Sequence, residues 1–260
     1  MISVIIPTYK EPEALDLCLR SAVEGMKTNY EEIIVVVDGT YDINKEVLDK
    51  YETVKYIVLD ENYGTGHAIN IGVSSATQPY VLIVNDDNVF PRDWDKKLVL
   101  YCNENWVVAP NHIEPYDSIF EQFHIKDLGR DPKTFDLEKF WDYEDSISEK
   151  ETDVTGSTFP VLISKNAFLY LGGWDTNYPS QAGLVADWDF FLKAKLSGLR
   201  MMRSYRSHFY HFVSLAQKST QQEEANRLTE IECHEYAKWK WGDYIKHDPK
   251  TNDNCDCGCC

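Results

Sequence analysis

Apolar residues along the first hundred positions follow two alternating patterns. Short runs of branched apolar residues predict buried strands at residues 2–7, 32–37, 54–59 and 80–84. Between these runs the apolar positions recur at helical spacing, which predicts helices at residues 43–51 and 66–76 and an earlier helix that begins near Pro12. Strands that alternate with helices indicate an α/β protein, with a mostly parallel sheet flanked by helices and a Rossmann-like N-terminal half.

The pattern weakens after residue 110. Residues 111–150 mix acids with Phe140, Trp141 and Tyr143 and show no clean period. The segment is either an insertion that shapes a substrate site or a loosely packed surface; exposed aromatic residues are costly, which favours the first interpretation. Further on, the pattern predicts a strand at residues 158–163 and helices at residues 165–171, 187–197 and 217–236.

Two adjacent carboxylates end the fourth predicted strand. The apolar run of residues 81–84 stops at Asn85, Asp86, Asp87 and Asn88. The carboxyl ends of parallel strands face the crevice where open α/β sheets bind ligands, and Mg²⁺ or Mn²⁺ prefers oxygen ligands together with phosphate. The alternative is a solvated turn, since Asp and Asn are common turn residues. The sequence pattern alone does not decide between a cation site and a solvated turn.

Charge and composition exclude some partners. The chain of 260 residues has 26 Lys and Arg against 43 Asp and Glu, a formal net charge of −17. Such a balance argues against nonspecific binding to nucleic acid or to an anionic membrane. No signal-peptide pattern is visible and no apolar run is long enough for a transmembrane segment, so the expected location is cytoplasmic.

The seven cysteines fall into two groups. Cys18, Cys102 and Cys233 are scattered, as buried thiols of cytosolic proteins are. The other four crowd residues 255–260, within a tail predicted at residues 249–260. We expect a flexible terminus; thiolate metal binding and a prenylated tail are the alternatives, and no polybasic segment supports the last.

Five segments together resemble the family 2 glycosyltransferases of GT-A fold. They are residues 3–9 (SVIIPTY), 35–40 (VVVDGT), 61–64 (ENYG) with 68–70 (AIN), 85–88 (NDDN) and 172–175 (GGWD). The resemblance covers residues 1 to about 215 and implies a nucleotide-sugar donor, a divalent cation and inversion at the anomeric carbon. It divides one domain into a nucleotide-sugar-binding half (1–110) and an acceptor-binding and catalytic half (111–215), followed by a helical segment (216–248).

The resemblance assigns the donor site. Pro7 and Thr8 are expected to turn the chain just past the first strand, and Asp38 to contact the nucleoside, although an Asp-Gly turn explains Asp38 equally well on residue chemistry. Gly66 allows close approach before a helix N-terminus that favours anions. The remaining donor-site residues implied by the resemblance are Tyr9, Glu11, Asn70, Asn85 and Asp86.

Asp87 is the expected metal ligand, for Mn²⁺ or Mg²⁺. Asn85 stands where the family usually has an acid, which predicts modest metal affinity; an alternative register makes Asp86 and Asn88 the outer pair. His211 fits the family's metal-binding histidine better than His208 does, because Ser214 follows it by three residues. A histidine among aromatic residues is often simply packed, so packing is the alternative.

Asp187 matches the family's general base, which deprotonates the acceptor hydroxyl, although Ala186 replaces the usual Glu before it. The alternative is that Asp187 caps the following helix.

Trp174, Asp175 and Trp188 are the residues expected to bind substrate. The predicted activity is therefore transfer from a nucleotide-sugar, expected to be UDP-linked, to a glycan, protein, lipid-linked or small-molecule acceptor.

Two other functions share the fold. A sugar-nucleotide pyrophosphorylase would have a Gly-rich loop with basic residues after the first strand, and residues 7–11 lack it. A noncatalytic carbohydrate- or nucleotide-binding protein would not need Asp38, Asp87 and Asp187 together. The presence of all three acids in this sequence therefore argues against that function.

Overall fold

The computed structural model describes residues 1–28, 31–115, 124–148, 153–156, 158–213 and 220–242, so the cysteine-rich segment 249–260 lies outside it. The strands are β1 (Ile2–Thr8), β2 (Glu32–Asp38), β3 (Lys55–Leu59), β4 (Tyr80–Ile83), β5 (Asn88–Val89), β6 (Trp106–Glu114), β7 (His124–Ile125), β8 (Val161–Ser164) and β9 (Arg200–His211). The helices are α1 (Pro12–Glu24), α2 (Tyr41–Leu48), α3 (Thr65–Ser75), α4 (Trp94–Val99), α5 (Leu137–Ile147), α6 (Lys165–Tyr170), α7 (Ala186–Leu196) and α8 (Thr220–Trp241), with a short 3₁₀ helix at Pro132–Thr134.

Within the described ranges, the strands form one nine-stranded sheet in the order β3-β2-β1-β4-β8-β6-β9-β5, with β7 paired to β6. Strands β1 to β4 are parallel, as the alternating pattern predicted, whereas β8 is antiparallel to both β4 and β6. Because β6 and β9 are again parallel, the sheet is mixed but mostly parallel and joins both predicted halves.

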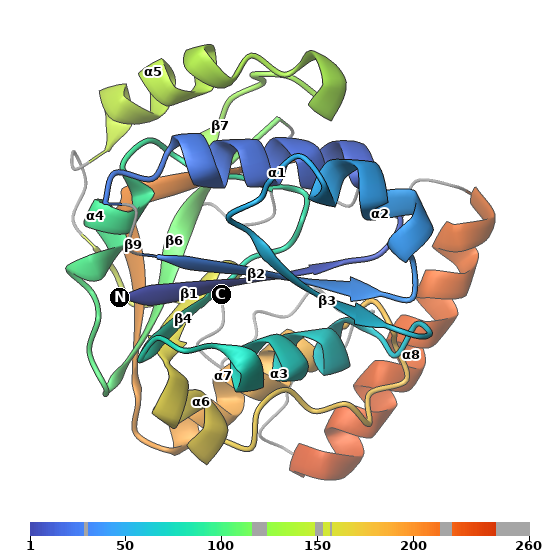
Figure 1. Cartoon of the computed structure of the whole chain (residues 1–260). Helices are drawn as coiled ribbons and strands as arrows, with labels where there is room; N and C mark the ends of the chain where they lie inside the picture. The colour runs from blue at the N-terminus through green and yellow to red at the C-terminus, as the bar shows by residue number, and fades with distance from the viewer. Residues whose placement is uncertain (29–30, 116–123, 149–152, 157, 214–219, 243–260) are drawn as a thin grey trace.

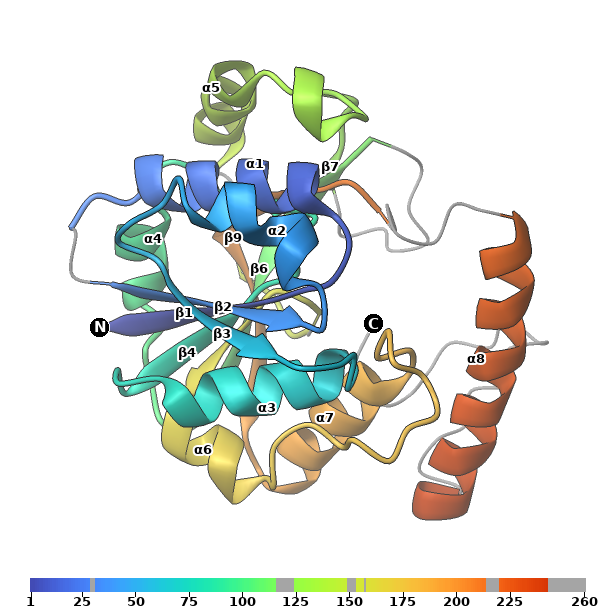
Figure 2. The ribbon, with the colours of Figure 1, turned by 45° about the vertical axis from the view of Figure 1, so that its right-hand side comes forward.

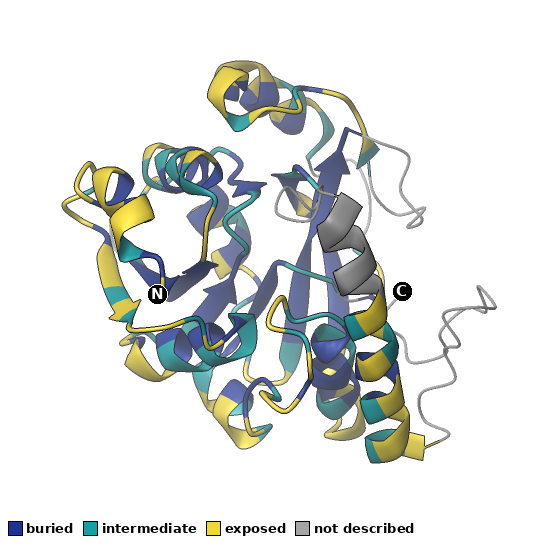
Figure 3. Cartoon of the chain, turned by 90° about the vertical axis from the view of Figure 1, so that its right-hand side faces the viewer, coloured by how far each residue is buried: buried dark blue, intermediate teal, exposed yellow. Residues whose placement is uncertain are grey.

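Helices cover both faces of the sheet (Figure 1). Successive residues of a strand point to opposite faces, so Val4 and Ile6 pack under α1, α2 and α4, while Ile5 packs against α3, α6 and α7. Strands β1, β2, β4, β6 and β8 are accordingly buried along nearly their whole length (Figure 3), whereas the edge strand β3 is largely exposed. This two-sided burial is why β1, β2 and β4 read as continuous apolar runs.

Segment 124–148 is packed, so a loosely packed surface was the wrong interpretation for these residues. Asp136 caps α5 by accepting a hydrogen bond from the backbone N–H of Lys139. Phe140 and Trp141 are buried against Val89 and Tyr210, and the Trp141 indole N–H donates to the Phe90 carbonyl at 2.9 Å.

The C-terminal helix also packs on the body. Cys233 and Ala237 of α8 are fully buried in the same apolar cluster as α3 and α7. Within the part of the chain that is described, no helix combines the length and the apolar character needed to cross a bilayer.

Candidate functional site

Acidic side chains gather where β1 and β4 end. The Thr8 hydroxyl donates to Asp86 at 2.6 Å, which joins the ends of the two neighbouring strands. Thr8 and Pro7 lie within β1, so the expected turn at these residues was wrong, because β1 pairs with β2 as far as Thr8. Burial, and then the negative charges of Asp87 and Glu11, raise the pKa of Asp86 to about 7, although the Thr8 hydrogen bond opposes the shift.

Asp87 lies beside a histidine from the far strand β9. The His211 Nε2 atom is 3.5 Å from Asp87 Oδ2, and the opposite ring nitrogen, Nδ1, is 2.9 Å from Glu114 Oε1. Burial opposes a charged ring, but Asp87 and Glu114 together raise the pKa of His211 to about 10. Burial also disfavours the Asp87 carboxylate, yet the charge of His211 leaves the pKa of Asp87 below its ordinary value. His208, by contrast, is fully buried next to Glu144.

These residues fit a divalent cation. Asp87 offers a carboxylate oxygen, and His211 offers, once its proton leaves, a ring nitrogen 3.5 Å from that oxygen. Protonated His211 places a positive charge beside Asp87, and a bound cation would supply a positive charge at the same place. Binding of a metal at such a site therefore releases the His211 proton.

Asp187 is the second residue of α7. The helix begins at Ala186 after Val185, so the alternative that Asp187 is the N-cap was wrong. Its carboxylate accepts a hydrogen bond from the backbone N–H of Trp188 at 2.9 Å, and burial raises the pKa of Asp187 to about 6. A carboxylate with a pKa near neutrality is suited to act as a general base.

The start of α7 lies at the same sheet edge as the acids. The backbone N–H of Thr65 donates to the Gln181 carbonyl at 2.7 Å, which brings the loop before α7 against the start of α3 (Figure 2). Because α3 follows the parallel strand β3, its start lies at the carboxyl edge of the sheet. Asp187 and Asp87 therefore both belong to the edge formed by the carboxyl ends of the parallel strands, where α/β sheets bind ligands.

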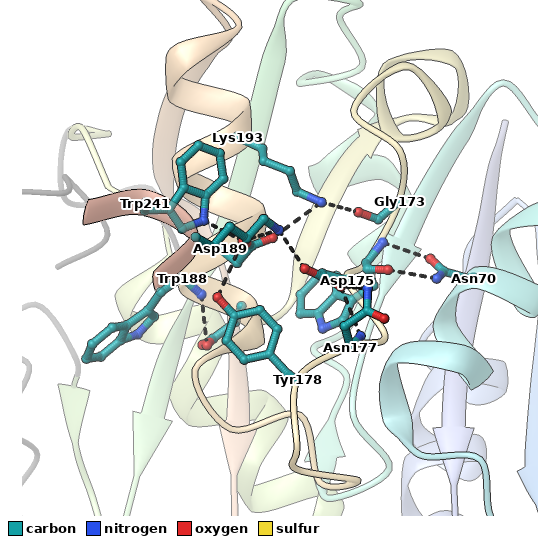
Figure 4. A network of polar contacts seen from close by, with 12 residues as sticks. Asn70, Gly173, Asp175, Asn177, Tyr178, Trp188, Asp189, Lys193 and Trp241 are labelled. Atoms are coloured by element: carbon teal, nitrogen blue, oxygen red, sulfur yellow. Dashed lines mark hydrogen bonds and ion pairs between the residues drawn. The ribbon is translucent and has the colours of Figure 1, made fainter. Parts of the chain in front are cut away.

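Asp189 does not share the environment of Asp187. It is fully buried in a polar network with Tyr178, Lys193 and Trp241 (Figure 4), and the Trp241 indole N–H donates to its carboxylate at 2.6 Å. Positions two apart on a helix do not share a face, as expected from the sequence.

Asp175 belongs to the same polar network. Lys240 of α8 lies 2.5 Å from Asp175 and 2.7 Å from Asp189, and it thereby bridges the two carboxylates. Burial disfavours the charged form, but the Lys240 ammonium and the amides of Asn177 lower the pKa of Asp175 to about 2. Trp188, the third expected substrate residue, is partly buried with its ring edge-on to His234 of α8.

Three predicted residues meet around a cavity of about 150 Å³ between α3 and the loop before α7, lined by Gly66, Trp174 and Asp175 among others. Trp174 is only 3% exposed and stacks on Phe190, with ring centroids 4.9 Å apart. A Cβ at Gly66 would lie 2.9 Å from the Trp174 ring, so this glycine is needed for packing.

Asn70 and Asp38 hold backbone segments at the site. The Asn70 side chain donates to the Trp174 carbonyl at 2.9 Å and accepts from the Trp174 N–H at 2.8 Å. The two carboxylate oxygens of Asp38 accept from the backbone N–H groups of Tyr63 and Gly64, both at 2.8 Å. Both side chains position loops around the crevice; the predicted contacts with a donor remain predictions.

Comparison with known proteins identifies the family. The model of "Glycosyl transferase family 2" matches residues 3–169. The chain belongs to glycosyl transferase family 2. Glycosyltransferase GlyA of Streptococcus pneumoniae is 32% identical over 202 residues, which cover 75% of this chain and 25% of that protein. The undecaprenyl-phosphate 4-deoxy-4-formamido-L-arabinose transferase of Pectobacterium atrosepticum is 28% identical over 136 residues, 49% of this chain and 42% of the relative.

Solved structures share the fold. The crystal structure of TarS from S. aureus matches with a TM-score of 0.61 at 20% identity, over 89% of this chain and 39% of TarS. A shorter TarS fragment (1–349), solved in complex with UDP, matches with a TM-score of 0.57 at 18% identity, over 89% of this chain and 64% of the fragment. This member of glycosyl transferase family 2 thus has the GT-A fold that the segments indicated.

Sequence reasoning missed Glu114 in this family 2 glycosyltransferase. It ends β6, as Asp86 and Asp87 follow β4, and it reaches His211 from the neighbouring strand. The spacing of His112 and Glu114 was a usable signal, because residues two apart on a strand share a face. The bridging role of Lys240 had no sequence signal, since its partners lie far away in the chain.

Replacing Lys240 by methionine should loosen the packing of α8 against the rest of the domain. Asp175 and Asp189 would lose a shared cation, and a hydrogen bond to a charged group contributes about 1.5–3 kcal/mol. We expect faster amide hydrogen exchange throughout residues 228–241, little change for the exposed-residue variant Lys238→Met, and restored protection for Lys240→Arg. Unchanged exchange in Lys240→Met would show that apolar packing alone holds α8.

Proposed function

We propose that this glycosyltransferase moves a sugar from a UDP-linked donor to an acceptor hydroxyl with inversion, using Mn²⁺ or Mg²⁺ held by Asp87 and His211 and Asp187 as the general base. The observation that carries the proposal is the arrangement of one sheet edge. It combines an acidic pair beside a histidine with a separate carboxylate, Asp187, whose pKa burial raises to about 6. In this proposal Asp87 and His211 hold the cation, and Asp187 acts as the base.

The chain's own residues account for the proton and the nucleophile. Asp187 accepts the proton of the acceptor hydroxyl as the oxygen attacks the anomeric carbon. The bond from that carbon to the phosphate oxygen breaks on the opposite face of the sugar, which inverts the anomeric configuration and releases the nucleoside diphosphate. A bound cation supplies positive charge that neutralises the departing diphosphate.

The comparisons support the donor and suggest which acceptor to test first. UDP is favoured because a TarS structure was solved with UDP. Lipid-linked acceptors come first because the names of the Pectobacterium relative and of the glucosyl-dolichyl phosphate glucuronosyltransferase of Haloferax volcanii contain polyprenyl phosphates. Glycan, protein and small-molecule acceptors follow.

A thermal-shift screen tests the proposed function. A ligand that binds only the native state raises the melting temperature, and at equal ligand concentration the rise grows with affinity. UDP-, GDP- and dTDP-sugars are compared, each with Mn²⁺ and with EDTA. We expect UDP-sugars to give the largest shift, and only with Mn²⁺; equal shifts with EDTA, or a larger shift with another base, would contradict the proposal.

Asp38→Ala should weaken binding of UDP and of the whole UDP-sugar equally. The substitution removes the acceptor for the Tyr63 and Gly64 amides and frees the turn at the predicted nucleoside site, while the sugar end of the donor is untouched. Calorimetry measures both affinities. Unchanged UDP affinity would leave Asp38 with a purely structural role, and a loss for the UDP-sugar alone would place it at the sugar.

A further inference from the structure

His211 has a carboxylate at each ring nitrogen. Nε2 lies 3.5 Å from Asp87 Oδ2, and Nδ1 lies 2.9 Å from Glu114 Oε1. Strand pairing makes this arrangement: Ile113 of β6 is in register with Tyr210 of β9, which brings the next residues, Glu114 and His211, to the same level. Glu114 is 6% exposed, so water competes little for its carboxylate.

The ring of His211 is also held from one side. His112 stacks on it with ring centroids 5.0 Å apart and an interplanar angle of 30°. A stacked neighbour opposes rotation of the ring. The hydrogen bond to Glu114 favours the ring orientation with Nδ1 toward Glu114 and Nε2 toward Asp87. Both contacts act on the orientation of His211.

A histidine binds a metal through a ring nitrogen that carries no proton. In a neutral imidazole the single proton then resides on the other nitrogen, and an acceptor for that N–H fixes both tautomer and orientation. Glu114 is such an acceptor at Nδ1, so the lone pair of neutral His211 is left on Nε2, the atom that faces Asp87.

We propose that Glu114 is a positioning residue that keeps His211 in the Nδ1–H tautomer with Nε2 toward Asp87, ready to bind the divalent cation. The inference rests on the proposed function, since it requires a cation at Asp87 and His211. It assigns to Glu114 no contact with donor or acceptor.

A competing arrangement uses the same residues. Ligand atoms of His112, Glu114 and His211 lie within 4.8 Å of one another and offer a possible cation site of their own. A cation there would occupy Nδ1 of His211 and replace its hydrogen bond to Glu114. The two arrangements make opposite predictions for Asp87 and for His112.

The test measures Mn²⁺ affinity, not turnover, through the electron paramagnetic resonance signal of free Mn²⁺ titrated with protein and UDP. Glu114→Ala should weaken Mn²⁺ binding about 10- to 100-fold, the usual effect of losing a partner that orients a metal ligand. Glu114→Gln keeps a carbonyl acceptor and should recover part of that loss. Asp87→Asn should lose more affinity than Glu114→Ala, and His112→Phe, which keeps a stacked ring, should bind as the parent does.

A second readout keeps the inference testable if Glu114→Ala folds poorly. In protein with ¹⁵N-labelled histidine and saturating Mg²⁺ and UDP, the Nδ1–H proton of His211 should resonate far downfield and exchange slowly with water, because it is donated to a buried carboxylate. In Glu114→Gln that proton should move upfield and exchange faster. An unchanged Nδ1–H shift and exchange rate in this variant would overturn the inference.

The outcomes separate this inference from the proposed function. If the parent binds no Mn²⁺, or Asp87→Asn binds it as tightly as the parent, the proposed cation site fails. If Asp87→Asn loses Mn²⁺ while Glu114→Ala does not, only the role of Glu114 is overturned. Loss of Mn²⁺ in His112→Phe with full retention in Asp87→Asn would assign the cation to the competing site.

Discussion

Asp187→Asn is expected to lower the rate of sugar transfer about 10²- to 10⁴-fold, the usual contribution of a general base, with donor affinity nearly unchanged. Asparagine keeps the shape of the side chain and its acceptor oxygen for the Trp188 N–H, but it cannot accept the proton of a hydroxyl. Transfer is followed by release of UDP, and donor affinity by calorimetry.

The pH profile should carry the signature of the same residue. Burial raises the pKa of Asp187 to about 6, and the base must be deprotonated, so kcat/KM should fall as pH drops through about 6 and level off above it. The raised pKa also means that burial of the charged form opposes folding at neutral pH; this cost shrinks as pH falls through about 6 and is gone only below the ordinary pKa of the group, 3.8. Asp187→Asn should therefore melt no lower than the parent at neutral pH.

Two variants serve as controls for Asp187. Asp42 is the second residue of α2, as Asp187 is of α7, but it is exposed, so Asp42→Asn removes a first-turn acid without touching the site. It should leave transfer unchanged. Asp189→Asn should slow transfer less than Asp187→Asn but lower the melting temperature, because Asp189 is buried beside Lys240 and Trp241. Parental transfer by Asp187→Asn would refute the base assignment.

Asp87→Asn is expected to have the second large effect, a loss of transfer that added metal does not restore. An amide is a weaker cation ligand than a carboxylate, so the charge of the departing diphosphate would be poorly neutralised. The parent should lose activity in EDTA and regain it with excess Mn²⁺, which serves as the control for an intact fold.

The result that would contradict the metal assignment is specific. If the parent keeps its rate in EDTA, or Asp87→Asn turns over donor as fast as the parent, the charge of the leaving group must be neutralised by protein side chains. A retained melting temperature in Asp87→Asn is required for either conclusion.

Much of the fold could be predicted from local sequence. Strands buried on both faces, such as β1 and β2, read as apolar runs, and Pro12 marks the first residue of α1 because its fixed φ suits a helix start. The region after residue 110 was harder, because β6 and β9 pair across about ninety residues of chain. Long-range pairing leaves no local periodicity to read.

Some residues of the candidate site could likewise be predicted from local sequence, whereas contacts that depend on the fold could not. The position of Asp86 and Asp87 at the edge of the sheet could be predicted because they follow an apolar run, and the family pattern pointed to His211, which the structure places 3.5 Å from Asp87; their roles stay predictions. The hydrogen bonds that Asp38 and Asn70 make to loop backbones could not, because a carboxylate or amide that holds a turn has the same sequence as one that faces a ligand. The contact of Glu114 with His211 depends on the register of two strands.

The most direct test of the account is the configuration of the sugar first released from a UDP-sugar in the presence of Mn²⁺, followed by ¹H NMR within minutes of mixing, with water as acceptor if no other is known. We predict an anomer opposite to that of the donor, formed by the parent and not by Asp187→Asn. A first product with the donor's own configuration, or equal turnover by Asp187→Asn, would contradict an inverting mechanism with Asp187 as its base.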